Sequence, residues 1–349
     1  MNYWEVSLMD CQIKITDNKA VWKIQAALAL IFLLNPFLGV LSTLFFVFVS
    51  KEKSMAFYLV IILTLFMWCL QSTRSFHLGE PSDWAGNYYY NFHNAAITDT
   101  LTYLFFTTKE YAWQAFNLIG YYLFDGDFLS YANFIVALTY MFTFAAIYKF
   151  WNYIQADPRF LVASLCLFAF VTEVNGICNN LLRQQFAMSM MLYAIIERCT
   201  NGRILYPLLV ISFFTHTMTG FFIPFLFIRL GKKASFRFYI YIVLGFGLLY
   251  ILFTNLSIFS SSSFYAFQRL ATASNAYALK DIIQPSAVYP FLAVTVILYV
   301  KAFFFDSERR KCELYINNLF LILISMCLLM TSMPVSYTHL RAHETGAYL

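Results

Sequence analysis

Two polar residues in apolar surroundings are the first candidates for chemistry, Arg183 and His216. Arg183 lies about two turns into an apolar run predicted to be a helix, where an arginine costs roughly 2.5 to 3.5 kcal/mol on the membrane-insertion scale. Such a residue needs a partner or a task. His216 ends the next apolar run, and an imidazole can transfer a proton or bind a phosphate near neutral pH. If the two runs are antiparallel neighbours, both residues lie near the same membrane face.

Amide side chains accompany Arg183 at helical spacing. Asn179, Asn180 and Gln184 fall on the same stripe as Arg183, because positions three and four apart share a helix face. A guanidinium offers a planar fork of donors that matches phosphate oxygens. The stripe therefore predicts an anion site for a lipid phosphate or pyrophosphate. The alternative is structural: Arg183 could pair with Glu173 at the end of the preceding span and lock two helices together.

The composition indicates a polytopic membrane protein. The chain is 61% hydrophobic and only 12% charged, with a mean hydropathy of +0.65, whereas soluble domains carry about 25% charged residues. Its 349 residues suit an all-α bundle of about nine or ten transmembrane spans. The net charge of +5 then belongs to the loops and predicts no nucleic-acid partner. Seven cysteines without a CxxC pair predict neither a disulfide framework nor a zinc site.

Hydropathy divides the chain into spans around one long polar segment, residues 74–130, which contains an amphipathic stretch at 104–124 suited to the membrane surface. The run 204–230 is ambiguous. A hairpin of two short helices turning at Thr217 to Gly220 fits its flanking basic clusters better than one tilted span. The remaining predicted spans are 24–50, 55–73, 131–150, 160–175, 178–197, 237–259, 287–305 and 315–333.

Loop charges predict the orientation of these spans. Lysines and arginines concentrate in the loops assigned to the cytoplasm, which places the N-terminus, residues 74–130 and residues 260–286 outside. Scarce polar residues from separate segments then meet near the outer face. They are Arg74, Asp83, Glu173, Arg183 and His216.

Residues of the outer segment have both structural and functional interpretations. Arg74 could bind substrate or extend toward lipid headgroups, and Asp83 could take a proton from a sugar hydroxyl or start a turn. Asp125-Gly126-Asp127 has the form of a DxD metal motif but is more typical of a turn, so no metal site is predicted. The aromatic residues of 84–124 suit an interfacial belt, a sugar-stacking surface, or both.

Short motifs carry a family resemblance. The triplet Leu182-Arg183-Gln184, continued by QFAMSM, is followed by a run ending in a single histidine, SFFTHTMTGFF. Arg74, Gly79 and Asp83 with tyrosines after them complete the pattern, although Asn87 stands four residues after Asp83 and Tyr88 only follows it. The chain thereby resembles the EpsG branch of the Wzy-type O-antigen and exopolysaccharide polymerases.

The resemblance implies a multi-pass glycosyltransferase of the bacterial inner membrane. Its substrates would be polyprenyl-pyrophosphate-linked oligosaccharides, with membrane lipids and a chain-length-regulating co-polymerase as further candidate partners and no cofactor. Arg183 and Arg74, helped by Asn179, Asn180 and Gln184, would bind the pyrophosphate and glycan. Asp83, His216 and Glu173, in that order, are the candidate bases.

Other classes of protein remain open at this level. A flippase for lipid-linked glycans would need charges along a path through the membrane, and a membrane O-acyltransferase would act on the same polysaccharides. Residues 1–335 are expected to form one integral membrane domain. The tail 336–349 (SYTHLRAHETGAYL) resembles translated sequencing-adapter DNA, so it is expected to be non-native and the native C-terminus to be truncated.

Overall fold

The computed structural model describes residues 18–50, 52–74, 84–106, 110–170, 181–227 and 244. All secondary structure in these ranges is helical, as the all-α prediction requires. The chain divides into two compact units, Met1–Pro224 and Phe225–Leu349. The described elements are α1 (Asn18–Leu34), α2 (Pro36–Ser50), α3 (Lys53–Ser72), η1 (Trp84–Tyr88), α4 (Tyr89–Ile97), α5 (Thr100–Phe106), α6 (Tyr111–Leu123), α7 (Phe128–Ile154), α8 (Pro158–Phe170), α10 (Leu182–Asn201), α11 (Tyr206–Thr215), η2 (Thr217–Phe222) and α12 (Ile223–Phe227).

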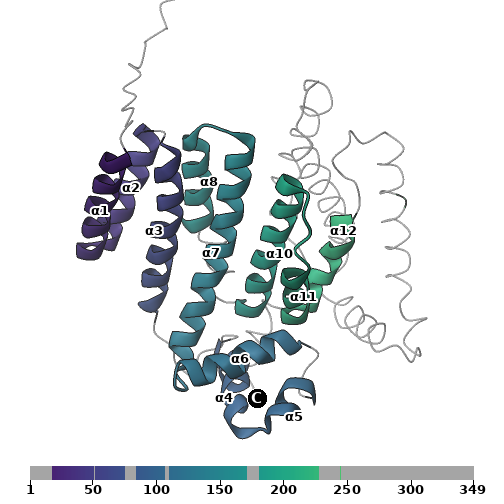
Figure 1. Cartoon of the computed structure of the whole chain (residues 1–349). Coiled ribbons are helices and arrows are strands. Elements are labelled where there is room, and N and C mark those ends of the chain that lie inside the picture. Colours follow the sequence, from purple (N-terminus) through teal and green to yellow (C-terminus); the bar gives the residue numbers. More distant parts are fainter. Residues whose placement is uncertain are drawn as a thin grey trace, which may run out of the picture. The chain divides into compact units, whose positions relative to one another are not determined.

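Helices α3 and α7 are long and apolar enough to cross a membrane. They form an antiparallel pair, since Lys53 at the start of α3 donates to Gln155 just after α7. Helix α10 packs beside α7, where Lys149 pairs with Glu197. Figure 1 shows α3, α7, α8 and α10 side by side. The helices predicted at 55–73 and 131–150 are confirmed, and those at 160–175 and 178–197 correspond to α8 and α10 where described.

The prediction of one span over 24–50 is wrong, because the chain reverses at Asn35. Helix α1 ends at Leu34 and α2 begins at Pro36, and the two pack as a hairpin. A Cβ on Gly39 would come within 2.4 Å of the Phe32 Cα, so only glycine permits this close approach. Pro36 lacks the N–H that a continuous helix needs, and the Asn35 Oδ1 instead accepts from the Leu38 N–H at 3.1 Å.

The hairpin also changes the end of the bundle at which α1 begins. The Tyr58 hydroxyl near the start of α3 donates to the Gln25 carbonyl in α1 at 2.9 Å. The beginning of α1 therefore lies at the end of the bundle where α3 begins. A single span would have placed it at the end where α3 finishes, together with residues 74–130.

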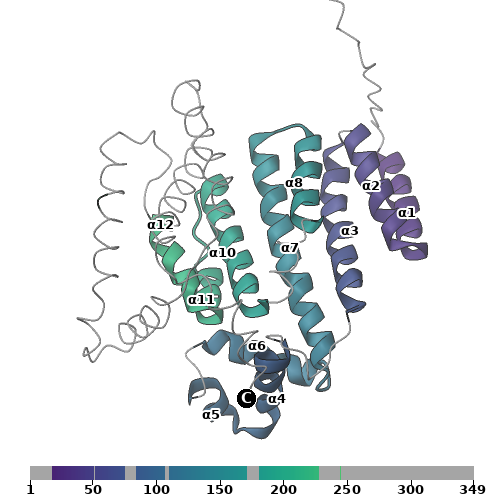
Figure 2. The same cartoon turned by 180° about the vertical axis from the view of Figure 1, so that it is seen from behind.

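Helices α4, α5 and α6 gather together beyond the ends of α3, α7 and α10, in both views of Figures 1 and 2. The stretch predicted to be amphipathic, 104–124, contains the end of α5 and all of α6. Helix α6 buries Gln114 and Asn117 and exposes Ile119 and Tyr122. The Asn117 Oδ1 accepts from the buried Tyr131 hydroxyl of α7 at 2.8 Å, which ties this layer to the bundle.

The Asp125-Gly126-Asp127 segment forms a turn, as interpreted from the sequence. Asp125 and Gly126 adopt positive φ angles of 50° and 75°, and Asp127 is the N-cap of α7. Its carboxylate accepts from the Leu129 N–H at 3.0 Å and from the Ser130 hydroxyl at 2.6 Å. These oxygens stabilise the first turn of a long helix.

The run 204–230 is broken at His216, as the hairpin interpretation requires. Helix α11 ends at Thr215, and the His216 carbonyl accepts from the Thr219 N–H at 3.0 Å. The chain then folds back closely, since a Cβ on Gly220 would lie 2.6 Å from the Phe213 ring of α11.

Candidate functional site

Arg183 lies in the first turn of α10, because the helix begins at Leu182 and not two turns earlier. The N-cap residue, Leu181, has no side chain that could accept from the helix. The first backbone N–H groups of α10 therefore lack intrahelical acceptors, and the positive end of the helix dipole faces the same place. A cation at this position is unfavourable unless an anion compensates it.

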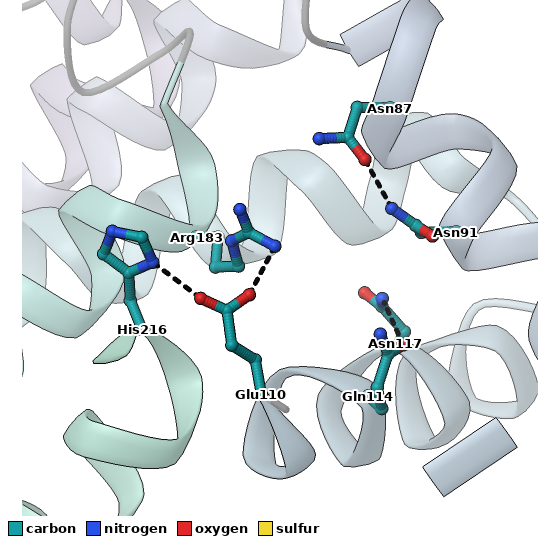
Figure 3. Close-up of polar contacts among 7 residues, drawn as sticks. All are labelled: Asn87, Asn91, Glu110, Gln114, Asn117, Arg183 and His216. Atoms are coloured by element: carbon teal, nitrogen blue, oxygen red, sulfur yellow. Dashed lines mark hydrogen bonds and ion pairs between the residues drawn. The ribbon is translucent and has the colours of Figure 1, made fainter. Parts of the chain in front are cut away.

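The compensating anion is Glu110, which bridges Arg183 and His216 (Figure 3). Its Oε2 lies 2.5 Å from the Arg183 Nη1, and its Oε1 lies 2.8 Å from the His216 Nδ1. The three side chains are only 21%, 13% and 12% exposed for Arg183, Glu110 and His216. One carboxylate thus holds a guanidinium and an imidazole, in a place shielded enough to strengthen both contacts.

The local sequence explains how α10 and α11 bring these residues together. Gly202 ends α10 in the left-handed conformation with φ 70°, which allows a tight connection to an antiparallel α11. The Ser212 hydroxyl then donates to the Ala187 carbonyl at 2.8 Å. Ala187 is one helical turn after Arg183, and Ser212 is one turn before His216. This contact therefore sets the two chemical residues opposite one another, as predicted for antiparallel neighbours.

Glu110 comes from the layer of helices beyond the bundle. It is the N-cap residue of α6, and α6 packs against α11. In the sequence, Glu110 lies within the polar segment 74–130, and no motif assigned it a role. It lies 106 residues from His216, and its one local signal is its place directly before an amphipathic helix. Glu173, which the sequence offered as a partner of Arg183, lies outside the described residues. Within the described residues, the carboxylate beside Arg183 is Glu110.

Hydrogen-bonding capacity remains on both residues that Glu110 holds. Within the part of the chain that the structure describes, the buried Arg183 Nε has no hydrogen-bond partner. It shares one edge of the guanidinium with Nη2, whereas Glu110 occupies Nη1. In the neutral tautomer of His216 whose Nδ1–H donates to Glu110, the Nε2 has a lone pair and can accept a proton. The site therefore offers a donor edge and a proton acceptor held by the same carboxylate.

Comparison with known proteins places the chain in a family. The profile of the EpsG family matches residues 57–340. The chain belongs to the EpsG family. No curated protein and no solved structure matches it. EpsG membership together with the apolar helices α3 and α7 indicates a membrane protein.

The remaining predicted site residues of this EpsG protein are only partly described. Arg74 follows α3, and its Cζ lies 4.2 Å from the centre of the buried Trp84 ring. This cation–π contact holds the guanidinium at the end of the bundle that carries Glu110. Gln184 is half-buried in the first turn of α10. The other predicted residues, Asp83, Glu173, Asn179 and Asn180, lie outside the described residues.

Charged residues at the opposite end of the bundle have a different arrangement in this EpsG protein. Glu197, near the end of α10, pairs with Lys149 of α7 and accepts from the Asn201 amide at 2.8 Å. One oxygen of Glu197 thus contacts α7, and the other accepts from a residue of α10 itself. This pair joins α7 to α10, and it provides a structural comparison for the Glu110 site.

Proposed function

We propose that this EpsG protein is a membrane glycosyltransferase of the polymerase type. It joins polyprenyl-diphosphate-linked oligosaccharide repeat units into O-antigen, capsule or exopolysaccharide at the outer face of the bacterial inner membrane. The observation that carries the proposal is the contact of Glu110 with both Arg183 and His216. The Arg183 Nε beside this contact is buried and has no partner among the described residues. A chain-length-regulating co-polymerase would be a separate partner.

A diphosphate is the anion that suits this position. Arg183 presents its Nε and Nη2 edge, and the first turn of α10, whose N-cap Leu181 makes no side-chain capping bond, adds backbone N–H groups beside it. These donors are fixed before the reaction, so they stabilise the charge that develops when a diphosphate leaves. In the proposal Arg74, Asn179, Asn180 and Gln184 supply further contacts to the diphosphate or its glycan. The proposed chemistry uses no cofactor.

The transfer step needs a base for the acceptor sugar. In the proposal the acceptor hydroxyl gives its proton to the His216 Nε2, and the hydroxyl oxygen forms a bond to the anomeric carbon of the donor glycan. The bond from that carbon to the diphosphate oxygen breaks, and the electron pair leaves with the polyprenyl diphosphate beside Arg183. His216 then releases its proton to solvent or to the departing diphosphate. Asp83 and Glu173 are the alternative bases.

Lipid-linked glycans from cells with and without the gene test the proposal. Deletion should leave single repeat units, and reintroducing the gene should restore the ladder of long chains. Reintroducing the Arg183→Ala variant should not restore the long chains, although the variant protein should reach the membrane in normal amount. Persistence of long chains in a deletion strain without a paralogue would refute the polymerase. Repeat units trapped on the inner leaflet would instead identify a flippase, and loss of acetyl groups at unchanged chain length would identify an O-acyltransferase.

A further inference from the structure

The carboxylate of Glu110 contacts both groups that the proposed reaction uses. Its two oxygens are divided, with Oε2 on the Arg183 Nη1 at 2.5 Å and Oε1 on the His216 Nδ1 at 2.8 Å. An ion pair that only joined helices would need Arg183 alone. The second contact acts on the imidazole, because a ring nitrogen that donates to a carboxylate fixes the tautomer and orientation of the ring.

We propose that Glu110 is the positioning residue of this site, an inference that rests on the proposed glycosyl transfer. Through Oε1 it keeps the proton of a neutral His216 on Nδ1 and leaves Nε2 to accept the proton of the acceptor hydroxyl. Through Oε2 it holds the Arg183 Nη1, so that the Nε and Nη2 edge stays available to the diphosphate. One carboxylate therefore aligns the proton acceptor with the leaving-group site.

The contacts give a directional expectation for Glu110→Gln. A glutamine has one acceptor oxygen and one amino group that only donates. The Arg183 Nη1 can only donate, so the glutamine oxygen should remain on Arg183 and its amino group should face His216. The imidazole can adapt by moving its proton to Nε2 and accepting at Nδ1. That tautomer cannot take a proton from the acceptor sugar.

Kinetics of the purified protein in nanodiscs test this expectation. The substrates are lipid-linked repeat units extracted from the deletion strain, and the binding probe is a polyprenyl diphosphate without sugar. Glu110→Gln should lower kcat by about 10²- to 10⁴-fold, the range for losing a general base, while probe binding weakens by less than about tenfold, since the Arg183 contact is kept. Glu197→Gln is the matched control, because it alters a carboxylate paired with Lys149 at the other end of α10. It should keep kcat within about threefold, because a substitution this far from the proposed reaction acts independently of it.

A double-variant comparison separates positioning from simple structural support. If Glu110 acts through His216, then Glu110→Gln should cost little further in kcat once His216→Ala is present. Equal losses in both backgrounds, or a Glu110→Gln protein within threefold of wild-type kcat, would overturn the positioning role. In either case inactivity of Arg183→Ala would leave the polymerase proposal standing. Full activity of Arg183→Ala would overturn the proposed function itself.

Discussion

Replacing Arg183 with lysine tests whether the guanidinium fork matters or only its charge. The fork uses Nη1 for Glu110 and leaves the Nε and Nη2 edge for an anion. A lysine ammonium is a single point charge and cannot keep the Glu110 contact while presenting two parallel donors to a phosphate. Arg183→Lys therefore loses at least one charge-assisted hydrogen bond to the diphosphate.

The size of the loss follows from that bond. A hydrogen bond to a charged group contributes about 1.5 to 3 kcal/mol, which corresponds to about a 10- to 150-fold decrease in kcat/KM. Elongation of lipid-linked repeat units in nanodiscs measures it, with the unfolding midpoint recorded for each variant. Arg183→Ala, which removes the charge as well, should be less active than Arg183→Lys.

Arg198→Lys is the matched control for the same helix. Arg198 lies near the end of α10 opposite Arg183, where its Nη1 donates to the Gly202 carbonyl. This substitution should leave kcat/KM within about twofold, because an exposed contact of this kind contributes little. An Arg183→Lys protein with more than half of the wild-type kcat/KM would refute the fork argument. So would an Arg198→Lys protein as impaired as Arg183→Lys.

Three further predictions concern packing, pH and orientation. Gly120→Ala should lower the free energy of unfolding by about 1 to 3 kcal/mol, measured by denaturation in detergent, because a Cβ there would lie 2.3 Å from the Tyr131 ring. Burial raises the pKa of Tyr103 to about 12. The neutral phenol should therefore stabilise the folded protein fully below pH 10, the unperturbed pKa, and this contribution should be lost as pH rises through about 12. Unfolding curves of Tyr103→Phe should show a smaller loss of stability over this range. In a chain without its native cysteines, an impermeant thiol reagent added outside intact spheroplasts should label Asn87→Cys and not Arg203→Cys, and the reverse pattern would place the site in the cytoplasm.

The Arg183–Glu110 pair also has a purely structural interpretation, which these experiments separate from catalysis. The pair joins α10 to α6, so its loss should destabilise the protein, and loss of the Lys149–Glu197 pair should do the same. If the Arg183–Glu110 pair only joined helices, its variants should lose activity in proportion to their loss of stability. The reaction proposed here predicts a large loss of activity in the Glu110 and Arg183 variants that the Glu197 variant does not share at comparable stability.

The class of protein and two residues of the candidate site, Arg183 and His216, could be predicted from the sequence alone. Hydropathy located α3 and α7, because a helix of about twenty apolar residues matches the hydrocarbon thickness of a bilayer, and this signal does not depend on the other helices. The cost of Arg183 in an apolar run marked it for a partner or a task, and the LRQ and histidine motifs gave the family that the profile match confirms. These signals are local, so one chain sufficed to read them.

The contact of Glu110 with Arg183 and His216, and the hairpin formed by the first apolar run, come from helix packing in three dimensions. Glu110 is 106 residues from His216, and no helical spacing connects them; the packing of α6 on α11 does. The reversal at Asn35 likewise depends on the close approach of Gly39 to Phe32. Hydropathy records how apolar a segment is, but a hairpin and a span of equal length have the same composition. Contacts between segments distant in the chain depend on how the helices pack against one another, which a pattern along one segment does not contain.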